Sequence, residues 1–189
     1  MTHTISTISG FRRVTRLAIT VAIFALPGAA SAQGYPFSQR QHITQNIALT
    51  EVDIEYGRPV ARGRELFGKL VPWDTIWHPG ADAATRITFK RDVLLEGHEV
   101  KAGTYSLWLI PRPNSAWTFI VSKTANVSHL DYAGPTKDAL RVDIMPETQS
   151  HLESMTWHFP MVLKDDAILR FQWGTTSLSI KVKAPYKPA

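Results

Sequence analysis

The sequence contains no cysteine, so disulfide bonds cannot stabilise its fold and thiol groups cannot serve as nucleophiles or metal ligands. Its stability must therefore come from the burial of apolar side chains. The Gly-x-Ser-x-Gly and Ser-x-x-Lys patterns of serine nucleophiles are absent, and no glycine-rich phosphate-binding loop is present. These absences exclude several enzyme classes before any positive feature is considered.

Long apolar runs are also scarce. The run from Leu17 to Ala30 has about 14 residues, which is too few to span a bilayer. A basic segment at 12–16 precedes it, and Ala30-Ser31-Ala32 supplies a small-residue cleavage pattern before Gln33. We predict that residues 1–32 are a bacterial signal peptide and that the chain is periplasmic or secreted, without stable membrane insertion after cleavage.

A strong charge imbalance is missing from the predicted mature chain. Removing the three signal arginines reduces the 21 Lys and Arg to 18, against 16 Asp and Glu. No basic block alternates with aromatic residues, so we expect no nucleic-acid partner. The high isoelectric point of the full sequence, about 9.6, is therefore uninformative about partners.

What the sequence does contain is alternation of apolar and polar residues over many short segments. Val52, Ile54 and Tyr56 alternate with acids, and the same period of two recurs every 8–12 residues up to Val182. This spacing predicts an all-β, antiparallel β-sandwich or flattened barrel with about nine or ten strands, forming a single β domain over 33–189. The two segments around Leu169 and Leu178 are expected to be separate strands.

Three local expectations accompany this fold. We expect one or two short helical turns, in the segments 64–70 and 126–132. A two-residue link, Thr50-Glu51, is expected to join the first two strands. The segment 103–110 is apolar on both faces, which indicates a central or doubly covered strand. Within it, Trp108 stands opposite the main apolar face and is expected to be exposed.

Three short segments of the chain have a distinctive residue order. Tyr56-Gly57-Arg58-Pro59, Lys101 to Leu107 and Asp165 to Trp173 resemble segments of a family of exported bacterial proteins, catalogued as a domain of unknown function (number twenty-nine eleven). The resemblance extends over nearly all of the predicted mature chain. Members of that family usually have Arg, Asn and Glu where this chain has His78, Asp82 and Ala83.

The segment Gly57–Phe89 contains the candidate binding residues. Arg58, Arg62 and Arg64 are expected to lie on a loop at a strand end, where guanidinium groups suit carboxylate or phosphate ligands. The alternative is that Arg58 and Arg64 bind loop carbonyls or neighbouring acids. Trp73 and Trp77 are expected either to line a pocket or to close the end of the sandwich, and Thr85 ends the same candidate stretch.

His78 and Asp82 form the other candidate pair. They could act as two metal ligands or as a base with its orienting carboxylate, provided that a distant histidine completes the site. The candidates for that third residue are His98, His129, His151 and His158. Asp82 is equally well explained as a turn residue whose side chain bonds the backbone.

Because no catalytic constellation is evident, we predict a non-catalytic module that binds a small-molecule, glycan or peptide ligand. Its tentative ligand-binding residues are Arg58, Arg64, Trp77, His78, Asp82 and Thr85. No cofactor, no metal site and no catalytic residue are predicted. The competing hypotheses are a hydrolase or metal-dependent enzyme that uses His78 and Asp82, and a structural envelope protein.

Overall fold

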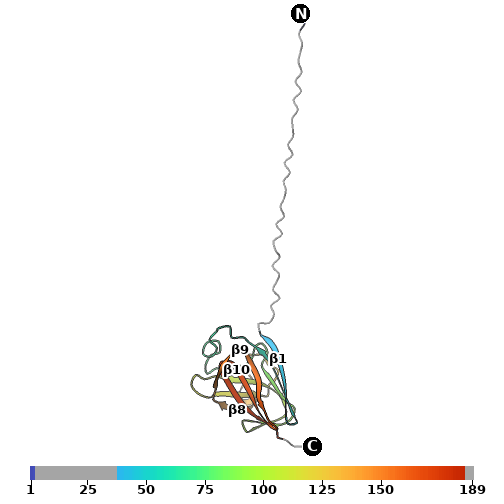
Figure 1. Ribbon diagram of the computed structural model, residues 1–189, viewed down its shortest axis with the longest axis vertical. Helices are drawn as coiled ribbons and strands as arrows, with labels where there is room; N and C mark the ends of the chain where they lie inside the picture. The colour runs from blue at the N-terminus through green and yellow to red at the C-terminus, as the bar shows by residue number, and fades with distance from the viewer. Residues whose placement is uncertain (3–37, 186–189) are drawn as a thin grey trace. The chain divides into compact units, whose positions relative to one another are not determined.

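The structure is a computed structural model that describes residues 1–2 and 38–185 (Figure 1). Apart from its first two residues, the predicted signal peptide lies outside the described part of the chain. In the described ranges, no helix has the length and apolarity needed to cross a membrane.

Two antiparallel sheets make up the described fold, which confirms the all-β prediction. One sheet has six strands in the order β1-β2-β3-β6-β7-β8, and the other has four in the order β5-β4-β10-β9. The strand bounds are β1 Gln39–Ile47, β2 Thr50–Arg58, β3 Arg86–Phe89, β4 Val93–Leu95, β5 His98–Val100, β6 Gly103–Ile110, β7 Trp117–Ser122, β8 Asp138–Ile144, β9 Glu147–Val162 and β10 Asp166–Lys183.

The main core lies between these two sheets. Ile54 and Leu107 of the six-stranded sheet belong to the same buried cluster as Trp157, Phe171 and Trp173 of the four-stranded sheet. All five side chains are at most 2% exposed, so the period-two alternation assigned their faces correctly. The arrangement is a sandwich and not a closed barrel.

The β1–β2 hairpin turns two residues earlier than predicted. Ile47 pairs with Thr50, so Ala48 and Leu49 form the turn and Thr50-Glu51 already belongs to β2. Ala48 has φ of 50°, a value that two-residue hairpin turns require. Ala48 lacks the usual Gly or Asn signal of such turns, and this is why the turn was misplaced.

Strand β6 lies between β3 and β7 and is buried on both faces, as its composition predicts. The expectation that Trp108 is exposed is wrong, because this side chain is only 2% exposed. A second, smaller apolar cluster covers it on the outer face of the sheet. The members of this outer cluster are Ala84, Trp108 and Ile120, with Ile76, Ile110, Val127 and Tyr132 packed against them.

The last strand is longer than predicted. Leu169 and Leu178 lie on one continuous 18-residue strand, β10, which pairs with the 16-residue β9. Irregular pairing around Gly174, where φ is 60°, marks a bulge. A bulge allows a strand to continue through a residue that sequence patterns mark as a break.

The predicted helical turn over 64–70 does not form. In its place, Gly68 donates to the carbonyl of Val71 at 2.8 Å, and Val71 donates to Leu66 at 2.8 Å. The second predicted position, 126–132, contains only a turn in which Asp131 donates to Ser128 at 3.2 Å. Among the described residues the single short helix is the 3-10 turn Pro135–Lys137.

Candidate functional site

The loop 59–85, which joins β2 to β3, contacts both sheets and contains most of the predicted site residues. Its first part pairs with β9, where Ala61 donates to the carbonyl of Glu153 at 2.8 Å. Its later part pairs with β6, where Trp77 and Leu109 exchange backbone hydrogen bonds of 2.8 and 2.7 Å. The loop is thereby fixed at both sheets.

Arg58, at the end of β2, holds the two sheets together. Its Nε donates to the carbonyl of Met155 and its Nη2 to Thr156 Oγ1, both at 3.3 Å and both on β9. These bonds favour the structural alternative for this arginine. Arg58 is not among the residues that line the cleft described below.

Arg64 is exposed but held in a fixed position by its own loop. Its Nε donates to the carbonyl of Ala61 at 2.9 Å, and its Nη2 donates to Val60 at 2.6 Å. A guanidinium has five N–H donors, so these two bonds leave donors for a ligand. Both partners are backbone carbonyls, so the positive charge of Arg64 is not neutralised by them.

Arg64 and Trp77 lie on one cleft of about 360 Å³. Apolar side chains and arginines line it together: Val60, Leu70, Val71, Trp77 and Trp173 with Arg62 and Arg64, and with Ser38, Pro59 and Gly80 beside them. A volume of this size lies at the lower end of the range for small-molecule sites. Arg62 belongs to the arginine cluster that the sequence singled out, whereas Trp173 was expected to build the core.

An aromatic cluster forms the inner wall of this cleft. Trp77 stacks on Trp173 with ring centres 6.1 Å apart and an interplanar angle of 14°. Phe67 contacts both rings edge-on, at 6.0 and 6.2 Å. The indole Nε1 of Trp173 is buried and has no hydrogen-bond partner among the described residues. An indole N–H is a donor that normally finds an acceptor when it is buried.

Glu153 brings a negative charge close to the arginines. Its carboxylate accepts from the backbone N–H of Arg62 at 2.5 Å and lies 3.0 Å from the Nε2 of His151. The hydrogen bond from His151, followed by that from Arg62, lowers the pKa of Glu153. The charge of Arg64 makes a smaller contribution in the same direction, so Glu153 lies within electrostatic reach of Arg64.

His78 lies on the opposite side of the loop from Trp77. It is 6% exposed and packs against Trp108 and His129, with ring centres 6.2 and 5.5 Å away. Burial, with a smaller contribution from His129, lowers the pKa of His78 to about 4, so the imidazole is neutral at pH 7. Its Nε2 is buried without a partner in the described part of the chain.

Asp82 is an exposed turn residue with φ of 65°. Its backbone carbonyl lies 2.9 Å from the Nδ1 of His129, so Asp82 positions that histidine through its main chain. His129 is one of the four histidines that were candidates to complete a site with His78 and Asp82. The structure places it beside His78.

Thr85 and Gly80 fix the shape of the turn between Trp77 and β3. Thr85 is fully buried and donates to the carbonyl of Pro79 at 2.8 Å, a carbonyl that also accepts from Trp157 Nε1 at 3.1 Å. A Cβ at Gly80 would lie 2.5 Å from Thr85 Oγ1, so a larger residue would not fit there without a shift. Thr85 is therefore placed as a structural residue behind the site.

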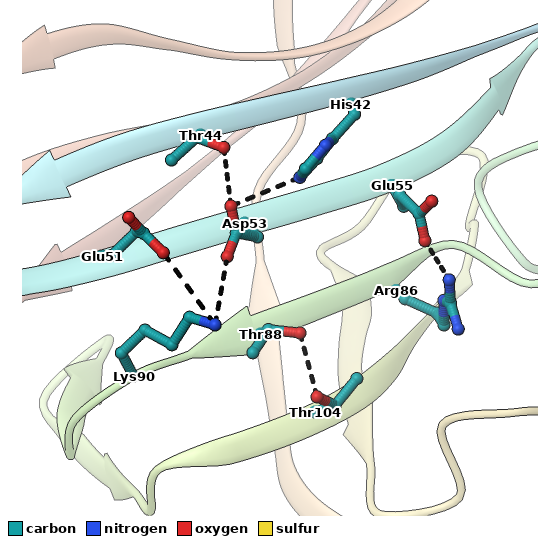
Figure 2. Close-up of polar contacts among 9 residues, drawn as sticks. All are labelled: His42, Thr44, Glu51, Asp53, Glu55, Arg86, Thr88, Lys90 and Thr104. Atoms are coloured by element: carbon teal, nitrogen blue, oxygen red, sulfur yellow. Dashed lines mark hydrogen bonds and ion pairs between the residues drawn. The ribbon is translucent and has the colours of Figure 1, made fainter.

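A polar face on β1, β2, β3 and β6 was missed by the sequence reasoning (Figure 2). Asp53 accepts from Thr44 at 2.6 Å and lies 3.3 Å from His42 and 3.9 Å from Lys90. Arg86 forms an ion pair with Glu55, and this hydrogen bond is the largest cause of the lowered pKa of Glu55.

This polar face borders two shallow hollows of about 320 and 610 Å³, which share Glu55 and Arg86. The sequence signal for it was the polar half of each alternating strand, which is also the normal composition of a solvent-facing sheet. The side chains bond one another in cross-strand pairs, as Thr88 and Thr104 do at 2.9 Å (Figure 2). Mutual pairing of this kind is sufficient to explain the face.

Within residues 1–2 and 38–185, no group of three or more His, Cys, Asp or Glu side chains is arranged to hold a metal ion. The model of the family described as "Protein of unknown function (DUF2911)" matches residues 38–182, so the chain belongs to that family. No curated protein and no solved structure matches the chain.

Proposed function

We propose that this member of the DUF2911 family is a non-catalytic binding module for a small molecule that has a carboxylate beside an apolar or aromatic ring. The ligand occupies the cleft of about 360 Å³ between Arg64 and the Trp77–Trp173 stack. The observation that supports this most is the combination of an apolar wall with a guanidinium that is held by two backbone carbonyls.

The two parts of the cleft suit the two parts of such a ligand. Arg64 is held by two backbone carbonyls, so little side-chain freedom is lost when a carboxylate binds it. Trp77, which is only partly buried, offers an apolar surface to a ring, and the buried indole of Trp173 stacks behind it. A ligand with only one of these features would use half of the site.

The basic segment, apolar run and small-residue pattern of residues 12–32 support a place for this module in the periplasm or outside the cell. Free carboxylate-bearing molecules are available as ligands in either compartment. Mass spectrometry of the mature N-terminus tests this part of the proposal, and a chain that begins at Gln33 is the expected result.

A pair of matched ligands tests the binding function. We expect an aromatic carboxylate such as indole-3-acetate to raise the unfolding temperature by about 3–6 °C at ten times its Kd, and the corresponding uncharged amide to have a much smaller effect. Arg64→Ala should abolish the response to the acid. Arg91→Ala is the control, because Arg91 is exposed and lies outside the cleft.

Two results would contradict the proposal. One is an equal rise of the unfolding temperature with the acid and with the amide, which would show that Arg64 does not recognise the carboxylate. The other is no saturable response to any member of a panel of small acids, which would favour the structural envelope protein. The enzyme hypothesis for His78 and Asp82 has less support, because the carbonyl of Asp82 bonds His129 and its carboxylate is directed to no described partner.

A further inference from the structure

His78 and His129 come together from two loops that are distant in the sequence. Their ring centres lie 5.5 Å apart, with 40° between the ring planes. The contact is supported by pairing of the two loops, in which Ala84 donates to the carbonyl of Val127 at 3.3 Å. An isolated β-bridge between Ala83 and Ser128 joins the same loops, so the approach of the imidazoles is built into the backbone.

The hydrogen bond of His129 determines which of its nitrogens is available. Its Nδ1 lies 2.9 Å from the backbone carbonyl of Asp82, and a carbonyl only accepts, so Nδ1 holds the proton. The lone pair of the neutral ring is then on Nε2. Histidines that bind metals show this pattern, because donation to a backbone carbonyl fixes the tautomer and the ring orientation. His129 is an exposed residue.

His78 supplies the second available nitrogen. The residue is 6% exposed, and its Nε2 is buried without a hydrogen-bond partner in the described residues. Buried polar atoms in folded proteins are nearly always bonded to protein, water or an ion.

The ring separation agrees with two imidazoles on one tetrahedral ion. Zinc–nitrogen bonds of about 2.0–2.1 Å in a tetrahedral arrangement place two ring centres about 5.2 Å apart. A square-planar ion with its ligands at right angles would place them about 4.5 Å apart. The observed 5.5 Å is closer to the tetrahedral value.

We propose that His78 and His129 bind one Zn²⁺ through their Nε2 atoms. Two protein nitrogens leave two tetrahedral positions for water or a small ligand, so we expect exchangeable binding and not a permanent structural site. Imidazole ligands without carboxylates favour Zn²⁺ over Ca²⁺ or Mg²⁺. His78 and Trp77 lie on opposite sides of the loop, and Gly80, which lines the proposed cleft, lies next to the His78 ring.

Isothermal titration of Zn²⁺ into untagged, chelator-treated protein tests the site. We expect about one Zn²⁺ per chain in the wild type and a Kd at least tenfold weaker in His129→Ala, because one of two ligands is lost. His129 is exposed, so this variant should fold. His98→Ala is the matched control, because His98 is also exposed but lies on β5 in the other sheet.

Imidazole nitrogen NMR gives a second measurement that does not depend on affinity. Zn²⁺ should shift the Nε2 resonances of His78 and His129 and leave that of His98 unchanged. Equal Zn²⁺ affinity in wild type and His129→Ala would overturn the proposal, as would unshifted Nε2 resonances, which would leave His78 as a core histidine bonded to water.

Discussion

Trp77 and His78 are neighbours in the sequence but belong to opposite sides of the six-stranded sheet. Trp77 bridges Leu109, and both side chains join the main core between the sheets. His78 instead packs against Trp108 in the outer cluster. Consecutive residues of an extended segment point in opposite directions, so one short stretch serves two separate sites. The inner side offers an arginine and an indole stack, and the outer side offers two imidazoles.

The strongest test of this comparison is whether the small outer cluster is as tightly packed as the main core. Trp108→Ala should lower the free energy of unfolding by about 3–5 kcal/mol, because the side chain is 2% exposed and its removal leaves a cavity. Trp77→Ala should cost less, because Trp77 is only partly buried. Urea denaturation measures both variants, and a loss below about 1 kcal/mol for Trp108→Ala would mean that the outer cluster is loosely formed.

The next largest effect that we expect is a loss of stability at low pH, which comes from His78 on the outer side of the sheet. The pKa of His78 is about 4 in the folded protein and 6.5 in the unfolded chain, so between these values the unfolded state binds more protons. Stability should therefore fall as the pH decreases from 6.5 to 4, by up to about 3 kcal/mol from this residue. The partly buried His158, whose pKa is also lowered, contributes in the same direction.

Comparison with His78→Gln isolates this contribution. In the presence of a chelator, the difference in stability between wild type and His78→Gln should shrink as the pH falls from 7 to 4. A difference that stays constant would show that folding does not lower the pKa of His78. His129, the titratable group that faces His78, is present in both proteins.

A smaller effect is expected from the turn that separates the two sides. Thr85→Val keeps the shape of the side chain but removes its hydrogen bond to Pro79, so we expect a loss of about 1–2 kcal/mol. Thr88→Val is the control, because the Thr88–Thr104 bond is exposed. Both variants can be measured by thermal denaturation. Equal losses of stability would show that the buried hydrogen bond of Thr85 contributes no more than the exposed bond of Thr88.

The smallest effect should come from the polar face in Figure 2. Arg86→Ala breaks the half-exposed ion pair with Glu55 and a 2.9 Å bond to Asn126, and exposed pairs of this kind are worth about 0–1 kcal/mol. Because salt screens such charges, the effect should decrease further in 1 M NaCl. A larger and salt-independent loss would indicate that this face has a structural role comparable to that of the covered half of the sheet.

Much of the fold followed from residue alternation, because the period of two directly reports which face of a strand is buried. This principle assigned Trp157 and Phe171 to the core correctly. It could not detect that Val127 and Tyr132 cover Trp108, since that contact depends on how a distant loop folds back. It also missed the continuity of β10, because a bulge at Gly174 has the same sequence signal as a turn.

The unusual composition of the loop after β2 was visible in the sequence, but the partners of its residues were not. Gly, Pro and Arg marked the loop after β2, and the structure places Arg64 and Trp77 on one cleft. The role of Arg58 depended on the approach of β9, about a hundred residues later, where Met155 accepts its hydrogen bond. The choice of His129 among four histidines was equally inaccessible, because only the tertiary fold brings it to His78.

In the proposed function, the cleft beside Arg64 binds a carboxylate ligand against the Trp77–Trp173 stack. Nitrogen-edited NMR of the indole N–H groups during titration with indole-3-acetate tests it most directly. We expect saturable shifts of the indole resonances of Trp77 and Trp173, and we expect these shifts to be lost in Arg64→Ala. The resonance of Trp108, whose Nε1 donates to Ser106 Oγ at 2.8 Å, should stay unchanged. Unchanged resonances of Trp77 and Trp173 at millimolar ligand would contradict it.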